Sequence, residues 1–163
     1  MGHKEKAFLP IMVDLQRFRC LVIGGGEVAY RKTKNILEFN GAATVIAPEL
    51  VPELQKLVDT GEIKATKRKY ERGDVNDFDI VFCATGDEEV DELVKQDCDK
   101  ADKLLNVADV PELCNFIMPA TIKRGDFVVA LSSQGEAPFY VKEKRQQIQS
   151  MISPMVADIT EIA

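Results

Sequence analysis

The chain has 163 residues, which suits one domain, or one domain with a short appendage, around a substantial core. Its 45% hydrophobic and 29% charged content excludes a disordered protein, and no apolar run approaches the roughly 20 residues of a membrane span. The net charge of −6 argues against a nucleic-acid partner, and the amino terminus lacks the apolar stretch of a signal peptide. We therefore expect a globular, cytoplasmic protein.

Strand-like and helix-like segments alternate over the first two thirds of the chain. Short apolar runs predict strands at 19–23, 43–47, 79–84 and 103–107, and the more polar segment 63–68 is predicted as an edge strand. The segments between them predict helices at 27–39, 50–59 and 88–101, with Asn40-Gly41 as the stop signal of the first. This alternation is typical of an α/β fold with right-handed crossovers and a parallel sheet covered on both faces.

The pattern changes after residue 107. Two extended runs around Arg124-Gly125-Asp126 predict an antiparallel hairpin. From Pro138 onward the sequence predicts a helix, which Pro154 should kink or interrupt. The predicted fold class is therefore a parallel α/β sheet followed by a β-hairpin and a C-terminal helix.

A glycine-rich turn links the first predicted strand to the first predicted helix. Gly24, Gly26 and Ala29 fit the pattern G-x-G-x-x-A. The first glycine permits the sharp turn, the second lets the backbone approach a pyrophosphate, and the small third residue lets helix and strand pack closely. The helix N-terminus adds free N–H groups and partial positive charge. This context predicts a Rossmann-type dinucleotide site, against the alternative of a glycine turn without a ligand.

The ribose-binding acid of such folds has no obvious counterpart at the end of the second strand. That strand ends Ile46-Ala47-Pro48, so either Glu49 or the main chain at residues 48–50 is expected to hold the ribose. No arginine stands there to receive a 2′-phosphate, which favours NAD over NADP. The predicted cofactor-binding residues are Gly24, Gly25, Gly26, Glu27, Val28, Pro48, Glu49, Leu50, Thr85 and Gly86.

The cysteines and the histidine predict no metal site. The four cysteines are too far apart in sequence for a C-x-x-C pair, and Cys20 and Cys83 lie in apolar runs where cysteine acts as a small buried hydrophobe. We expect reduced thiols. The single histidine, His3, lies near the amino terminus, which excludes a histidine-based site.

Four segments in order carry a resemblance to a known family: GGGEVAYRK, FCATGDEEV, NVADVPELCNFIMPA and VVALSSQGEAP. From residue 8 to about 150 the chain resembles precorrin-2 dehydrogenase, the NAD-dependent module of siroheme synthases. The resemblance implies oxidation of the tetrapyrrole precorrin-2 to sirohydrochlorin with hydride transfer to NAD⁺. Some members of the family also insert Fe²⁺.

The same resemblance implies a domain organisation. It places an NAD-binding Rossmann domain at 1–115, and a dimerisation hairpin with the start of a helical segment at 116–163. The C-terminal helical domain of the family is then absent or truncated. A homodimer also follows from exposed apolar residues around the hairpin, unless these fold back on their own chain. These residues are Phe116, Ile117, Phe127, Val129 and Phe139.

Site residues also follow from the resemblance. Asp109 matches the aspartate of the family implicated in dehydrogenation and chelation, where a carboxylate can orient substrate, accept protons or guide the metal. Ser132 and Ser133 match its serine pair, and Asn115 is expected to contact substrate. The alternatives are that Asp109 caps the loop ahead of Pro111 and that the serines are plain turn formers.

An anionic tetrapyrrole needs local positive charge on this acidic chain. One basic cluster, Arg31, Lys32 and Lys34, follows the glycines, and a second lies in the late helix at 142–145. The alternative is that both are solvated helix faces. Two other functions compete with the predicted one, namely an NAD-sensing regulatory module without catalysis and a different small-molecule oxidoreductase with the same cofactor half.

Overall fold

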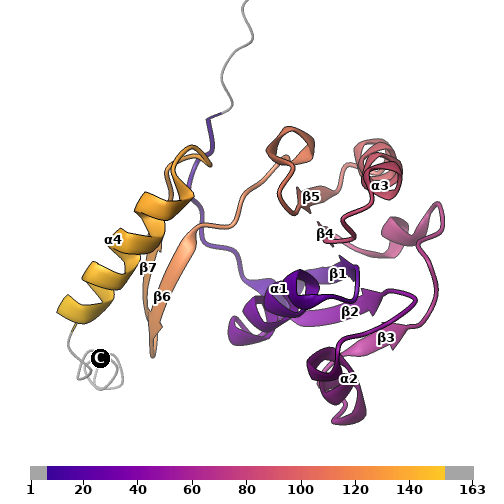
Figure 1. Cartoon of the computed structure of the whole chain (residues 1–163), viewed down its shortest axis with the longest axis horizontal. Coiled ribbons are helices and arrows are strands. Elements are labelled where there is room, and N and C mark those ends of the chain that lie inside the picture. The colour runs from indigo at the N-terminus through magenta and orange to yellow at the C-terminus, as the bar shows by residue number, and fades with distance from the viewer. Residues whose placement is uncertain (1–6, 153–163) are drawn as a thin grey trace, which may run out of the picture. The chain divides into compact units, whose positions relative to one another are not determined.

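The computed structural model describes residues 7–152. They form two compact units. The larger unit is Pro10–Phe116, and the smaller combines the described residues up to Leu9 with those from Ile117 onward. Figure 1 labels the elements along the chain.

The larger unit alternates strands and helices as the sequence predicts. Its strands are β1 (Arg19–Ile23), β2 (Ala42–Ile46), β3 (Lys64–Thr66), β4 (Ile80–Cys83) and β5 (Leu104–Val107). Its helices are α1 (Glu27–Glu38), α2 (Pro52–Asp59) and α3 (Glu88–Lys100). Short 3-10 turns are η1 (Leu15–Arg17), η2 (Asp74–Asp77) and η3 (Pro111–Leu113).

All five strands pair in parallel in the order β3-β2-β1-β4-β5. The chain runs outward from β1 through β2 to β3 and then returns to the other side of β1 for β4. This strand order is that of the Rossmann fold, whose ligands bind outside the carboxyl ends of the strands where the order reverses. The predicted fold class is confirmed.

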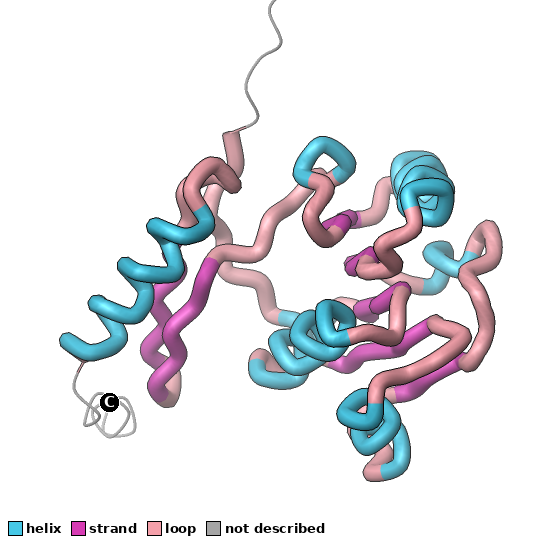
Figure 2. Tube along the Cα trace, viewed as in Figure 1, coloured by secondary structure: helices cyan, strands magenta, loops and turns pink. Residues whose placement is uncertain are grey.

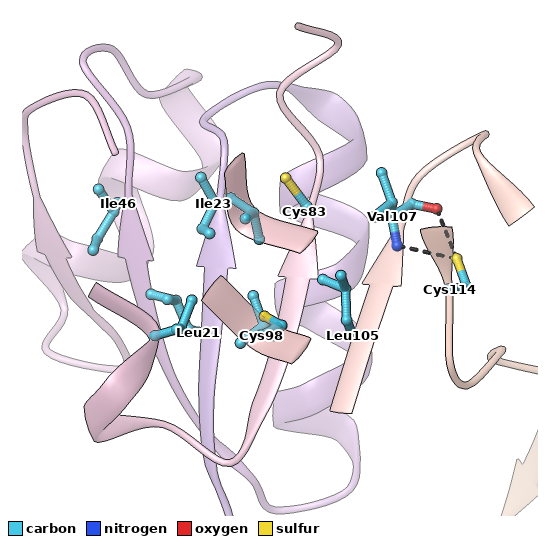
Figure 3. Close-up of a cluster of buried hydrophobic side chains, with 11 residues drawn as sticks. Leu21, Ile23, Ile46, Cys83, Cys98, Leu105, Val107 and Cys114 are labelled. Atoms are coloured by element: carbon cyan, nitrogen blue, oxygen red, sulfur yellow. Dashed lines mark hydrogen bonds between the residues drawn. The ribbon is translucent and has the colours of Figure 1, made fainter. Parts of the chain in front are cut away.

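The core explains why the central strands β1 and β4 are almost continuously apolar. Leu21 and Ile23 of β1 belong to one buried cluster with Val94 and Cys98 of α3, so α3 covers that face (Figure 3). On the opposite face α1 packs near Phe82, whose ring lies 5.9 Å from the Lys32 ammonium. A strand buried on both faces has no polar side, as parallel sheets require.

The ends of α1 and α2 follow from local chemistry. Asn40 takes a left-handed φ of 57°, and the Gly41 N–H then donates to the Ile36 carbonyl at 2.9 Å, which ends α1 where the sequence predicts. Helix α2 begins at Pro52, two residues later than predicted. The Val51 N–H donates to the Gly25 carbonyl at 2.8 Å, which keeps this segment extended until proline starts the helix.

The smaller unit contains the predicted hairpin and helix (Figure 2). Strands β6 (Ala120–Arg124) and β7 (Phe127–Leu131) pair antiparallel around a two-residue turn in which Gly125 has a φ of 57°. Helix α4 (Pro138–Met151) follows. The predicted interruption at Pro154 falls outside the described residues. Within residues 7–152 no helix is long and apolar enough to cross a membrane.

Candidate functional site

A cavity of about 530 Å³ opens at the carboxyl ends of β1, β2 and β4. Its size is in the range of ligand sites, and its place in the sheet is where open α/β folds bind nucleotides. The lining residues are Ile23, Gly24, Gly25, Gly26, Ile46, Ala47, Pro48, Glu49, Leu50, Val51, Lys69, Tyr70, Ala84, Thr85, Asp87 and Val90.

Two glycines of the turn are required by the protein itself. Gly24 has a φ of 121°, and a Cβ there would collide with the Ala84 carbonyl group. A Cβ on Gly25 would collide with the Glu49 carbonyl oxygen and come within 2.9 Å of the Ala47 Cβ. These glycines allow the turn after β1 to pack against the segments after β2 and β4.

Gly26 differs from both. A Cβ on Gly26 would meet no protein atom within 4 Å, although the residue lines the cavity. Gly26 is also the N-cap of α1 and makes no side-chain cap. The first intrahelical bond runs from the Tyr30 N–H to the Gly26 carbonyl at 2.9 Å, so the N–H groups of the first turn have no intrahelical partner. This space beside a helix N-terminus fits a dinucleotide pyrophosphate.

Glu49 and Lys69 bring opposite charges to the same cavity. Glu49 is exposed just beyond β2, where a ribose-binding acid is expected. Lys69 and Tyr70 arrive from the segment after β3. The Tyr70 hydroxyl donates to Asp97 at 2.7 Å, and burial together with this hydrogen bond raises the pKa of Tyr70 far above its usual range.

The rim after β4 is ordered by a buried carboxylate. The Thr85 hydroxyl donates to Asp91 at 2.6 Å, and the Cys83 thiol lies 3.1 Å from the same oxygen. Burial and Asp91 raise the pKa of Cys83, so it remains a thiol. Asp87 accepts the N–H groups of Glu89 and Val90 and so caps α3.

The structure brings most of the predicted cofactor residues together. Those that line the cavity are Gly24, Gly25, Gly26, Pro48, Glu49, Leu50 and Thr85. Glu27 and Val28 begin α1 beside Gly26, and Gly86 connects Thr85 to Asp87, but these three do not line the cavity. Sequence reasoning missed Lys69, Tyr70, Asp87 and Val90. The rule that ligands lie at strand carboxyl ends would have found the first two, which follow β3.

The loop after β5 carries Asp109. Its backbone has a φ of 61°, a left-handed conformation that aspartate tolerates better than most residues. The loop is held by Cys114, whose sulfur accepts the Val107 N–H at 3.2 Å and donates to the Val107 carbonyl at 3.3 Å (Figure 3). Asp109 itself is exposed. The carboxylate is thus presented to solvent on a fixed backbone.

The three predicted substrate residues make local hydrogen bonds. Asn115 accepts the Leu105 N–H at 2.7 Å and donates to the Lys103 carbonyl at 2.8 Å. In the smaller unit, Ser132 accepts the Gln134 N–H at 3.0 Å and Ser133 accepts the Ala137 N–H at 2.9 Å. The hydroxyl oxygens of both serines are the acceptors, so these bonds do not use the hydroxyl protons.

The cysteines are all free and buried, which confirms the interpretation of Cys20 and Cys83 as core residues. Burial raises the pKa of Cys20 to about 11 and that of Cys98 to about 12. Among residues 7–152 no group of three His, Cys, Asp or Glu side chains could hold a metal ion.

Known proteins with similar sequences are siroheme synthases. The protein of Pseudoalteromonas atlantica is 35% identical over 150 residues, which are 92% of this chain and 32% of that protein. Those of Saccharophagus degradans and Methylobacillus flagellatus are 33% and 37% identical, over 96% and 88% of this chain and 34% and 31% of theirs. The chain thus spans about a third of the length of these relatives. The resemblance carried by the four sequence segments is confirmed.

A solved structure and a family model agree with this result. The structure of SirC, precorrin-2 dehydrogenase, is 28% identical and superposes with a TM-score of 0.82, over 94% of this chain and 76% of that one. The model of a family described as putative NAD(P)-binding matches residues 11–120, which include the whole five-stranded sheet and its glycine turn. The chain therefore belongs to this NAD(P)-binding family.

Proposed function

We propose that the chain oxidises precorrin-2 to sirohydrochlorin with NAD⁺. One observation carries the proposal: the glycine turn opens at Gly26 into a nucleotide-sized cavity, in a chain whose relatives are siroheme synthases and SirC. NAD⁺ supplies the hydride acceptor when bound. Precorrin-2 loses a hydride to it and a proton to a base, and NADH and sirohydrochlorin are the products.

The residues of the larger unit bind and orient the dinucleotide. The Gly26 backbone and the first turn of α1, with Glu27 and Val28, hold the pyrophosphate. Glu49, with the main chain at Pro48 and Leu50, accepts the ribose hydroxyls. Thr85 and Gly86 position the other half of the dinucleotide beside the carboxyl end of β4. Each role is supported by position at the cavity or at the start of α1, except that of Gly86, which rests on its place next to Thr85.

Asp109 is the residue we assign to proton transfer. It is an exposed carboxylate at the carboxyl end of the strand next to β4, where the sheet places its ligands. A positioned carboxylate of this kind contributes about 10²-fold or more to a rate. Ser132, Ser133 and Asn115 are proposed to contact the substrate, and the serine hydroxyl protons are suited to its carboxylates.

An anaerobic assay with precorrin-2 and NAD⁺ tests the proposal. NADH and sirohydrochlorin should appear together in equal amounts. Binding of NAD⁺ without turnover would favour the sensing module instead. Addition of Fe²⁺ to the sirohydrochlorin formed then tests metal insertion, which we propose as a second activity with Fe²⁺ as a substrate.

Asp109→Asn is the sharper test of the proton-transfer role, because asparagine also tolerates the left-handed backbone. We expect unchanged NAD⁺ affinity, an unchanged melting temperature and turnover reduced about 10²-fold or more. A loop-capping role predicts a lower melting temperature with normal turnover per folded molecule. A stable variant with the wild-type rate would remove Asp109 from the chemistry.

We also propose a cytoplasmic homodimer. Free cysteines suit a reducing compartment. Phe139 on α4 is 87% exposed and Phe127 of β7 is 40% exposed, so this unit presents apolar side chains that a partner would cover. Light scattering at tens of micromolar should give twice the mass of one 18.2 kDa chain. Phe139→Asp should yield monomer, whereas Ile11→Asp, an equally apolar exposed site in the larger unit, should not.

A further inference from the structure

Lys32 is a half-buried lysine on the cofactor-binding helix. It lies in the second turn of α1, and its ammonium donates to the Asn106 side-chain oxygen at 2.7 Å. The Phe82 ring lies 5.9 Å from the same ammonium. Its neighbours Arg31 and Lys34 are exposed. The interpretation of this cluster as a solvated face therefore does not fit Lys32, because removing an ammonium from water is costly.

Asn106 links Lys32 to the segment that follows the Asp109 loop. The side chain is 6% exposed and lies in β5. Its amide donates to the Phe116 carbonyl at 3.2 Å and lies 3.6 Å from the Cys114 sulfur. Both partners belong to the segment that returns after the Asp109 loop. Lys32 and Asn106 thus connect α1 to this loop within one unit.

Burial and neighbouring charges both act on the pKa of Lys32. Burial lowers the pKa of Lys32 from its usual value, and Arg31 lowers it further. Cys114 and, to a smaller extent, Asp109 raise it. The other groups that face Lys32 from β4 and β5, Phe82 and Asn106, do not titrate.

We propose that Lys32 is a positioning residue for Asp109, because through Asn106 it ties the nucleotide-binding helix to the loop that carries this carboxylate. The proposal rests on the proposed function, in which Asp109 handles a proton. It assigns a specific role to a lysine that sequence alone grouped with two exposed neighbours. A neutral or misplaced side chain at position 32 should impair the function of Asp109 and leave nucleotide binding unchanged.

The charge coupling can be measured without any turnover. NMR titration of the lysine side chains, with the Lys32 signal assigned from Lys32→Arg, should show Lys32 losing its proton below the other lysines. Asp109→Asn should lower the pKa of Lys32 further, because a stabilising negative charge is lost. Asp59→Asn, at the end of α2, should leave it unchanged. A Lys32 signal insensitive to Asp109→Asn would overturn the coupling.

Kinetics then test the positioning role. Lys32→Met should lower precorrin-2 turnover at least tenfold while the Kd for NAD⁺ stays within twofold. Lys56→Met, at an exposed lysine on α2, should leave turnover unchanged. Wild-type turnover should fall as pH rises through the lowered pKa of Lys32, and Lys32→Arg should keep its activity to higher pH because arginine stays charged.

The possible results distinguish a failure of the proposed function from a failure of the positioning role. A wild-type chain that does not oxidise precorrin-2 overturns the proposed function, while the titration still decides the coupling. The positioning role is overturned if Lys32→Met has the wild-type turnover per folded molecule. It is also overturned if the turnover of Lys32→Arg falls at the same alkaline pH as that of the wild type. If Lys32→Met does not fold, Lys32→Arg and the titration decide.

Discussion

The three adjacent glycines should respond differently to the same methyl group. Gly26→Ala adds a Cβ that meets no protein atom within 4 Å, at a φ of −89° that alanine readily adopts. Replacing glycine by alanine at the N-cap lowers the free energy of unfolding by up to about 1 kcal/mol. Alanine raises it by a similar amount, because it makes the unfolded chain less flexible. We expect a melting temperature within about 3 °C of wild type.

The NAD⁺ affinity of Gly26→Ala should nevertheless fall. The added methyl occupies cavity space that the pyrophosphate needs, so we expect at least a tenfold higher Kd, about 1.4 kcal/mol. Gly26→Val should weaken binding further. Calorimetry with NAD⁺, run beside thermal unfolding, measures both quantities on one preparation. A folded Gly26→Ala variant with wild-type affinity would refute the placement of the pyrophosphate.

Gly25→Ala is the matched control. Its Cβ would collide with the Glu49 carbonyl oxygen, so the substitution destabilises the folded protein. Overpacking of this kind costs roughly 1–3 kcal/mol, which lowers the melting temperature of a chain this size by roughly 2–12 °C. Gly24→Ala should destabilise more, because its φ of 121° adds backbone strain.

Two further predictions concern stability and thiol chemistry. Burial alone raises the pKa of Asp97, but hydrogen bonds from Tyr70 and the Gly73 N–H, with Arg72, lower it overall. A carboxylate whose pKa is lowered by folding stabilises the native state at pH values above its unfolded-state pKa, about 3.9. That stabilisation is lost as the pH falls through the lower pKa of the folded state. Asp97→Asn should therefore cost roughly 2–3 kcal/mol at pH 7 in urea unfolding and progressively less as the pH falls below about 3.9, and a loss that does not change with pH would contradict this. The Cys20, Cys83 and Cys98 thiols should resist a thiolate-directed reagent at pH 8 until the chain unfolds, and fast labelling of the native protein would show that burial does not hold them protonated.

The parts of the fold that were predictable depend on local patterns. Four apolar runs, the more polar edge strand, the glycine turn and the Asn40-Gly41 stop each carry their signal within a few residues, so element type and order were correct. The start of α2 was not, because the Val51–Gly25 hydrogen bond joins residues far apart in sequence. Strand β3 is also shorter than predicted, since the Arg68 N–H turns back to the Thr66 carbonyl.

The candidate site was predictable where it follows a motif. Gly25 occupies a variable position of G-x-G-x-x-A, and only its contact with Glu49 shows why glycine is needed there. Lys69 and Tyr70 carry no motif and reach the cavity only because β3 lies beside β2. Lys32 looked like its exposed neighbours, because its partner Asn106 is distant in sequence. The predicted roles of Asp109, Asn115 and the serines stay predictions.

The Asn115 contacts have a consequence for how the sheet ends. Its backbone N–H and side-chain oxygen engage the carbonyl and N–H of Leu105, much as a neighbouring strand would, so the outer side of β5 is occupied. At the opposite edge β3 has only three residues, with Lys64 exposed. Short, charged or covered edges resist the addition of a strand from another molecule. The five-stranded sheet is thus protected at both margins against the addition of further strands.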